Sequence, residues 1–268
     1  MWAEIWRPLR RSAAEPKLRR DVRNLAIAGV AGATLQVAEA PVTRRLTRLV
    51  ETRKWGLLKR LPLPLWRELA LSVVLMDYTF YIWHALNHKI GLLWRFHQPH
   101  HVDLGLDAST ALRFHFTELT ISVAWRAAQI LMIGVSPLAF SVWQLFMLLE
   151  ILFHHSNLDL PVRIERIISK IIVTPRLHGI HHSIIEQEQN SNLSSGLTAW
   201  DYLHGTLRTN VPQSEITIGV PAYLDPKATD LVSVLAMPFT EQRFSWRLPD
   251  GRIPTRPEQA NDDHGLVP

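Results

Sequence analysis

The chain has 268 residues, of which 47% are hydrophobic, and it carries 29 Lys and Arg against 24 Asp and Glu, a formal net charge of +5. This composition excludes a disordered chain, and the length suits one domain with a modest tail. The absence of cysteine excludes disulfides, iron–sulfur clusters, thiolate nucleophiles and cysteine-type zinc sites. Thirteen histidines are present, eleven of them between His84 and His182, so the composition indicates a metal site built from histidine.

Three apolar stretches, residues 26–42, 65–83 and 119–153, predict helices that lie in a membrane. Turn-forming residues at 134–137 interrupt the longest stretch, which is therefore predicted to form two helices joined by a tight hairpin. A spanning helix needs about 20 mostly apolar residues, and a helix that is apolar all round is buried in protein or in lipid. We predict an all-α fold, in which an integral membrane domain of about four apolar helices carries a helical histidine-rich cap. The alternative is a soluble helical protein with buried core helices.

The basic residues predict the orientation of the chain. The turn near residue 134 contains no Lys or Arg, whereas the histidine-rich segments and the C-terminal half contain many, so the positive-inside rule places the histidines in the cytosol. The segment 26–42 has basic residues on both flanks. Spanning, re-entrant and interfacial positions therefore all stay open for it.

The chain divides into three expected regions. Residues 1–23 form a basic lead suited to anionic lipid headgroups, and residues 24–210 form the membrane-embedded, histidine-rich domain. Residues 211–268 form a C-terminal tail with recurring Pro and turn residues, and its last dozen residues are polar enough to be disordered.

The spacing of the histidines is the strongest signal in the sequence. Residues at positions i, i+3 and i+4 of a helix project together, so an H-x-x-H-H pattern offers two or three imidazoles to one point. Imidazole suits iron, zinc, copper and nickel, and eight such histidines exceed the four ligands of one closed site, which indicates two metals. They occur as H-x3-H and two copies of H-x-x-H-H: His84 and His88, then His97, His100 and His101, then His178, His181 and His182.

Local helix chemistry supports the second H-x-x-H-H copy. The Thr-Pro pair at 174–175 predicts a helix that begins just before His178, with Thr as the N-cap and Pro as the first helical residue. The first copy contains Pro99, which lacks a backbone N–H. We therefore expect His97 in a turn and His100 in the first turn of a new helix.

Several further residues are weaker candidates. His154 and His155 are adjacent and cannot both face one point from a helix, so His155 is favoured as a ligand. His115, at a predicted helix entry, either orients a ligand or forms a hydrogen bond at the membrane surface. Metal-bound histidine usually donates its other N–H to a carboxylate or carbonyl. The residues considered as such supporting partners are Asp77, Asp103, Asp107, His115, His154, Asn192 and Asp201.

The order of these motifs and the residues around them resemble the fatty acid hydroxylase/sterol desaturase superfamily of membrane-bound non-haem di-iron enzymes. The resemblance covers roughly residues 70–210. It rests on the segments 77–88, 93–101, 107–115, 155–158, 174–183, 190–192 and 200–206.

This resemblance implies that residues 24–210 form a catalytic domain that hydroxylates an unactivated C–H of a lipid with O2 as co-substrate. It implies two iron ions, although zinc can occupy imidazole sites in purified protein. The chain has no haem-attachment or dinucleotide motif, so a cytochrome b5- or ferredoxin-like partner is expected to supply electrons, steered by the basic surface. The implied ligands are His84, His88, His97, His100, His101, His155, His178, His181 and His182.

Two rival functions stay open. A membrane fatty-acyl desaturase shares the H-x3-H and H-x-x-H-H motifs, and its product would contain a double bond without inserted oxygen. A non-enzymatic metal-binding or metal-transport protein is the second, although transporters place ionisable groups near mid-membrane. Nucleic-acid binding is not expected, because the basic residues flank apolar helices, where lipid headgroups explain them.

Overall fold

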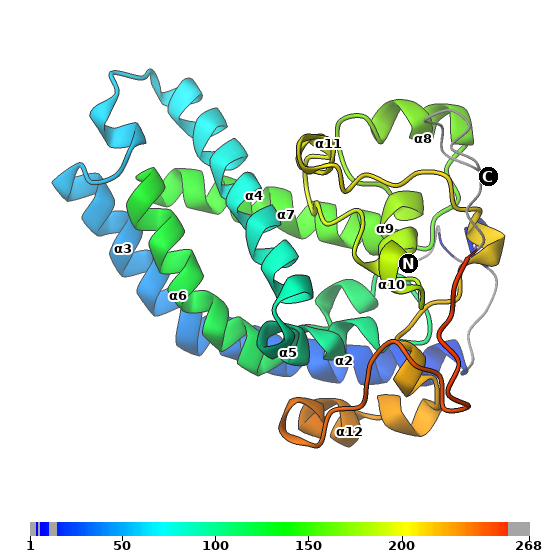
Figure 1. Cartoon of the computed structure of the whole chain (residues 1–268). Coiled ribbons are helices and arrows are strands. Elements are labelled where there is room, and N and C mark those ends of the chain that lie inside the picture. The colour runs from blue at the N-terminus through cyan, green and yellow to red at the C-terminus, as the bar shows by residue number, and fades with distance from the viewer. Residues whose placement is uncertain (1–3, 5, 11–14, 257–268) are drawn as a thin grey trace.

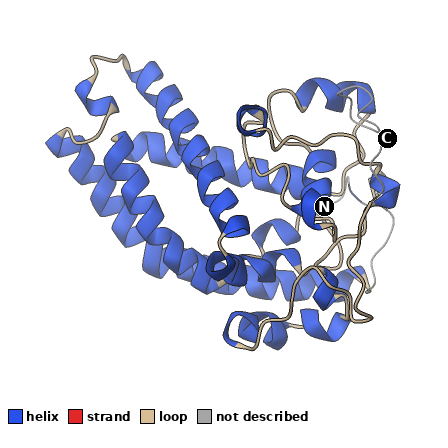
Figure 2. Ribbon diagram, viewed as in Figure 1, coloured by secondary structure: helices blue, strands red, loops and turns tan. Residues whose placement is uncertain are grey.

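The computed structural model describes residue 4, residues 6–10 and residues 15–256. Within these residues the chain is helical, its only β-type pairings being isolated bridges (Figure 2), so the predicted all-α class is confirmed. The expected disorder of the last dozen residues concerns positions 257–268, which lie outside the described residues.

A long helical rod runs along one side of the molecule (Figure 1). It consists of α2 (Lys17–Thr34), a π-helical segment η1 (Leu35–Glu39) and α3 (Ala40–Arg53). At 1.5 Å per residue the rod is roughly 55 Å long, and the apolar stretch 26–42 is its middle part. The first turns of α2 already belong to the folded structure, because Arg20 and Arg23 are buried.

Three further long helices complete the apolar bundle: α4 (Leu65–Lys89), α6 (Phe116–Ile133) and α7 (Pro137–His155). The predicted hairpin lies between α6 and α7. Gly134 ends α6 in the left-handed conformation, and the Ser136 hydroxyl accepts a hydrogen bond from the Ala139 N–H at the start of α7.

Three helices among the described residues are long and apolar enough to cross a membrane: Lys17–Arg60, Leu65–Lys89 and Pro137–His155. About four apolar helices were predicted. The fourth, α6, is not among them, because it falls short of this apolarity and carries the buried charged residues Glu118 and Arg126. It packs against the rod and α4, with α2, α3 and η1 among its neighbours.

The bundle core is closed at the end far from the histidines. Met76, Ile130 and Trp143 are buried there together. The loop after α3 packs directly on the α6–α7 turn, where a Cβ atom on Gly56 would collide with the backbone of Gly134. Both glycines have positive φ values, so this close approach needs residues without a side chain.

The cap is built from short helices at the other end of the bundle (Figure 1). They are α5 (Gly91–His101), α8 (Val162–Ile168), α9 (Pro175–His181), α10 (Glu186–Gln189), α11 (Ala199–His204) and α12 (Leu231–Ala236). The cap also contains the 3₁₀ turns η3 (Thr110–Leu112), η4 (Gln213–Glu215), η5 (Pro221–Tyr223), η6 (Pro226–Thr229) and η7 (Met237–Phe239), whereas η2 (Leu58–Arg60) lies between α3 and α4 at the opposite end.

The two predictions about helix starts in the cap have opposite outcomes. Helix α9 begins at Pro175 after the N-cap Thr174, which confirms the first. The expected break at Pro99 is wrong, because α5 continues through Pro99 to His101. Pro99 lies in the last turn, where it removes a single intrahelical hydrogen bond, and the whole turn is buried.

The segment after residue 210 folds back onto the cap and the rod. Val220, Tyr223 and Val234 form a second apolar cluster with Ile27 of α2 and Trp94 of α5. This cluster thereby joins α2, α5 and α12, which are far apart in the sequence.

Candidate metal centre

Nine histidines converge between the ends of α4 and α7 and the cap helices α5 and α9, and none of them is more than 9% exposed. They are the nine residues predicted as ligands. Within each group, ligand atoms lie within 4.8 Å of one another. The groups are His84, His88, His97 and His101; His100, His155, His178 and His182; and His101, His181 and His182.

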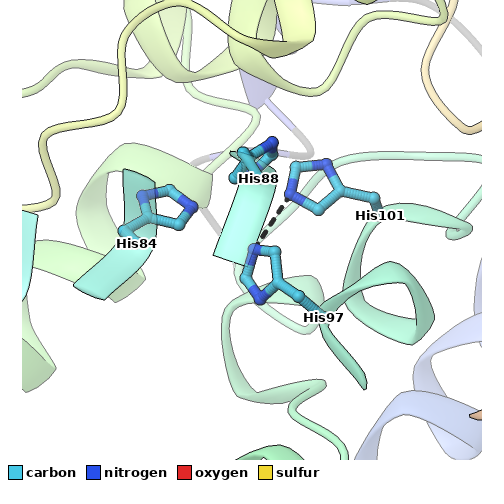
Figure 3. Close-up of side chains that lie close together, drawn as sticks. All are labelled: His84, His88, His97 and His101. Atoms are coloured by element: carbon cyan, nitrogen blue, oxygen red, sulfur yellow. Dashed lines mark hydrogen bonds between the residues drawn. The ribbon is translucent and has the colours of Figure 1, made fainter. Parts of the chain in front are cut away.

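The first group comes from two consecutive helices and is drawn in Figure 3. His84 and His88 lie one turn apart on α4, and His97 and His101 lie one turn apart on α5. The Nε2 atoms of His97 and His101 are 3.2 Å apart, and the four rings surround a common space.

The second group gathers three elements that are distant in sequence. The Nε2 atom of His155, at the end of α7, is 3.1 Å from Nε2 of His100 on α5 and 3.0 Å from Nε2 of His178 on α9. His182 follows α9 and brings its Nε2 within 3.1 Å of His178 Nε2. His181 lies between the two groups, since it shares a set with His101 and His182.

Hydrogen bonds on the outer nitrogens fix which nitrogen faces the centre. The Nδ1–H groups of His84, His155 and His181 donate to backbone carbonyls, those of Leu193 (2.7 Å), Ile151 (2.7 Å) and Ser191 (2.9 Å) respectively. A neutral imidazole has only one N–H, so each Nε2 of these rings presents a lone pair inward.

The inner nitrogens fit metal ions better than they fit one another. Inward lone pairs cannot hydrogen-bond to one another, because neither nitrogen carries a hydrogen. His181 Nε2 and both nitrogens of His88 have no hydrogen-bond partner among the described residues. Two nitrogens bound to one metal at 2.0–2.1 Å lie about 3 Å apart. The observed Nε2–Nε2 separations of 3.0–3.2 Å match this spacing.

Burial also places these imidazoles in the protonation state that binds metal. Desolvation is the main cause that lowers the pKa of His100, His101 and His178 well below the usual value, and neighbouring histidines lower it further. Desolvation lowers the pKa of His181 to about 3. These four rings are therefore neutral at pH 7, as metal ligands must be.

The supporting acceptors differ from those expected. Asp103 and Asp107 contact cations of α2: Arg20 lies 3.6 Å from Asp103 and also hydrogen-bonds to Asp107, as does Lys17. Within the described ranges, neither these aspartates nor Asp201 hydrogen-bonds to a cluster histidine.

The side-chain acceptor that the sequence reasoning missed is Glu118. His97 donates its Nδ1–H to Glu118 Oε1 at 3.0 Å, and both groups are buried. Glu118 lies in the first turn of α6, one position before the predicted apolar stretch 119–153. The only available signal was therefore a carboxylate three residues after His115.

Asn192 and Asp201 act on the centre through the backbone. Asn192, at a φ of 51°, donates to the carbonyls of Leu177 and Arg208. Asp201 accepts from the N–H groups of Leu193 (2.8 Å) and Ser194 (3.1 Å). These bonds hold the loop whose carbonyls at positions 191 and 193 receive the histidine N–H groups.

Asp77 also holds backbone in place, in a segment farther from the histidines. Its carboxylate accepts from the Leu197 N–H (2.9 Å) and from Trp200 Nε1 (2.7 Å), and so joins α4 to the segment that leads into α11. It does not contact the histidines of the described cluster through a hydrogen bond.

The remaining two histidine candidates lie outside the groups. His115 caps α6, accepting from the Thr117 N–H at Nδ1, while its Nε2 lies 3.1 Å from the Leu235 carbonyl. His154 packs its ring 4.1 Å from that of His178, but it belongs to no group, whereas the favoured His155 does.

Two neighbouring cavities share part of their lining, and the smaller one adjoins the histidines. A small one of about 30 Å³ touches the imidazoles and the side chain of Asn87, whose amide atoms are buried without a partner in the described chain. A larger one of about 380 Å³ lies between the rod, α4, α6 and α7. Both are lined by Phe80, Trp83, Phe114, Glu118 and Ile151. We call the larger one the apolar cavity.

The comparison with family models gives one match: the model for fatty acid hydroxylase covers residues 69–206. The chain belongs to this family, which confirms the resemblance derived from the sequence. All nine converging histidines lie within the matched residues, and together with the family they imply that the chain binds metal.

Three similar proteins illustrate the range of the family. Ornithine lipid hydroxylase OlsE of Rhizobium tropici is 31% identical over 180 residues, which is 67% of this chain and 52% of that protein. The cholesterol 25-hydroxylase-like protein of Danio rerio is 30% identical over 144 residues (52% of this chain, 55% of that protein). Human alkylglycerol monooxygenase is 28% identical over 131 residues (49% and 28%).

The chain thus spans about half the length of the first two relatives. No solved structure matches it significantly.

Proposed function

We propose that this protein is a membrane di-iron oxygenase that hydroxylates an unactivated C–H of a lipid with O2 and external electrons. One observation carries the proposal: two groups of four buried histidines adjoin a small cavity that shares its Phe, Trp and Ile lining with the apolar cavity. The names of the relatives, which are hydroxylases and monooxygenases of ornithine lipid, cholesterol and alkylglycerol, support the reaction type.

The two four-histidine groups would each hold one iron, with His181 between them. Bound iron would supply the activation of O2 that C–H oxidation requires. The carbonyls of residues 193, 151 and 191 turn the Nε2 atoms of His84, His155 and His181 inward, and burial keeps these three rings neutral. Glu118 orients His97 in the same manner.

The lining shared by the two cavities would position the substrate carbon. Phe80, Trp83, Phe114 and Ile151 leave only a small space beside the imidazoles. A hydrocarbon chain in the apolar cavity would displace water from this space, which protects the reacting carbon from competing reactions.

The membrane position, orientation and partner belong to the same proposal. Basic residues favour the cytosolic side for the histidine end. Histidine ligands do not supply electrons, so we propose a cytochrome b5- or ferredoxin-like donor attracted to the basic surface.

The test combines metal analysis with product analysis of the purified protein and of membranes from producing cells. Lipids formed under oxygen-18 should gain labelled oxygen, whereas a lipid with a new double bond and no label would support the desaturase. His181→Ala should bind less metal and should form no product. His204→Ala, on an exposed residue outside all three groups, is the matched control and should keep both. Full activity of His181→Ala would contradict the assignment of this ligand, and metal uptake without O2 consumption in the unsubstituted protein would contradict the oxygenase.

A further inference from the structure

An ionic pair lies in the wall of the apolar cavity, away from the histidines. Glu39 and Arg126 both line the cavity, are 6% and 7% exposed, and approach within 3.8 Å between Oε1 and Nε. Most of the remaining lining is apolar. Charged side chains in such a position are costly and usually functional.

The pair is incompletely satisfied as it stands. A separation of 3.8 Å is too long for a hydrogen bond, and Arg126 Nε has no hydrogen-bond partner within the described ranges. Another guanidinium nitrogen donates to Gln129 at 2.6 Å, and the guanidinium lies 4.3 Å from the Trp143 ring centre. The guanidinium is therefore held in place while one of its donors is left free.

Glu39 reaches the cavity from an irregular point of the rod. It is the last residue of the π-helical segment η1. Such segments are rare in proteins, and those that occur often lie at functional sites. No described residue donates a hydrogen bond to its carboxylate.

The chemistry of the pair selects a neutral polar group. A free N–H donor stands beside a carboxylate acceptor, and the two charges cancel. A hydroxyl can accept from Arg126 and donate to Glu39 at once, because it is both acceptor and donor. A carboxylate would be attracted by Arg126 but repelled by Glu39.

Helix geometry gives the approximate separation along α6 between this pair and Glu118, which adjoins the histidines. Glu118, which bonds His97, and Arg126 are eight positions apart on α6, which corresponds to about 12 Å along the helix at 1.5 Å per residue. The apolar cavity extends between these two residues.

We propose that Glu39 and Arg126 bind the hydroxyl group of a lipid substrate whose oxidised carbon lies about 12 Å away, beside the histidines. That the carbon beside the histidines is the one oxidised rests on the proposed function. Binding of the lipid hydroxyl by Glu39 and Arg126 does not depend on the proposed function.

The experiment measures binding by photolabelling of the purified, metal-loaded protein. The probes are dodecanol carrying a diazirine on the carbon farthest from the hydroxyl, its methyl ether, and the corresponding dodecanoate. The alcohol should label the wall at Trp83, Phe114 or Ile151 roughly tenfold more than the ether, since the ether cannot donate to Glu39. Equal labelling by alcohol and ether, or labels outside the cavity wall, would overturn the proposal.

Two substitutions sharpen the test. Arg126→Met should remove the preference for the alcohol, whereas Arg45→Met, on an exposed part of α3, should keep it. Glu39→Gln keeps the size of the side chain but leaves the Arg126 charge unbalanced. It should therefore shift the preference from alcohol to dodecanoate, and no shift would contradict the proposal even if Arg126→Met fails to fold.

The labelling needs neither O2 nor an electron donor, so it separates this proposal from the proposed function. Lipid oxidation without a preference for the alcohol would contradict only the hydroxyl site. Selective labelling without any oxidation would contradict only the oxygenase.

Discussion

The two groups of four histidines are assembled in different ways. The first group lies within 17 positions (101 − 84) on two consecutive helices, and the i, i+4 spacing alone puts each pair on one face. The second group extends over 82 positions (182 − 100) and needs α5, α7 and α9 to dock together. The first group therefore depends on local geometry, while the second depends on tertiary packing.

The largest expected effect separates the two groups by metal content. His178→Ala removes the ring whose Nε2 lies 3.0 Å from His155 and 3.1 Å from His182, and His88→Ala removes a member of the first group. Each variant should fall from about two bound metal ions per chain to about one, because each keeps the other group intact. Elemental analysis of purified protein measures this.

If the groups share their metals rather than hold one each, a single substitution will remove all of the metal. That result would contradict two separate sites. Oxidation of lipid should be lost in both variants, since the proposed reaction needs both irons.

The next effect tests the loop that supports His84 and His181. Asp201 is 1% exposed, and its carboxylate holds the N–H groups of Leu193 and Ser194. Asp201→Ala leaves these buried donors without an acceptor, which should lower the free energy of unfolding by about 3 kcal/mol. Asp250→Ala, on an exposed turn, should leave it unchanged in the same chemical denaturation experiment.

Metal analysis of the same variants tests the support itself. A stability loss without any loss of metal affinity would show that the loop carbonyls are dispensable for the two histidines. We expect Asp201→Ala to lower both the free energy of unfolding and the metal affinity.

A smaller effect concerns the carboxylate behind His97. Glu118→Gln keeps an oxygen acceptor but removes the charge, and it should weaken metal affinity about 10-fold, at the low end of the range for groups that orient metal-binding histidines. Competition with a chelator measures the change, and Glu241→Gln at an exposed position is the control. Unchanged affinity would mean that the two neighbouring α4 histidines suffice to fix His97.

The sequence predicts the helical class, the α6–α7 hairpin and the start of α9, because each depends on apolar stretches or on local capping and turn residues. The H-x3-H and H-x-x-H-H spacings likewise predict which imidazoles share a helix face. The family match supports the resemblance that these motifs carried.

Other features depend on contacts that spacing does not encode. Pro99 is accommodated in the last turn of α5 because the surrounding packing outweighs one missing hydrogen bond. Backbone carbonyls that receive histidine N–H groups have no side-chain signature, so aspartates were expected in their place. The packing of residues 220–237 on Ile27 is equally non-local. Glu39 and Arg126 meet across the cavity only once the rod lies along α6.

The smallest effect we predict lies outside both groups, at His115. Its Nδ1 accepts from the Thr117 N–H, and burial lowers the pKa of His115 below its usual value of 6.5. The neutral ring thus contributes stability that is fully present above pH 6.5 and is lost as the pH falls through the lowered pKa of the folded state. His115→Asn keeps an N-cap acceptor that does not titrate, so it should lose less stability than the wild type as the pH falls below 6.5, without a change in stability at neutral pH. Unfolding of metal-loaded wild type and variant at a series of pH values measures the difference. If the free energies of unfolding of wild type and variant instead fall in parallel below pH 6.5, the N-cap of α6 does not depend on the neutral ring. In that case the contact of His115 with Leu235 holds the start of α6.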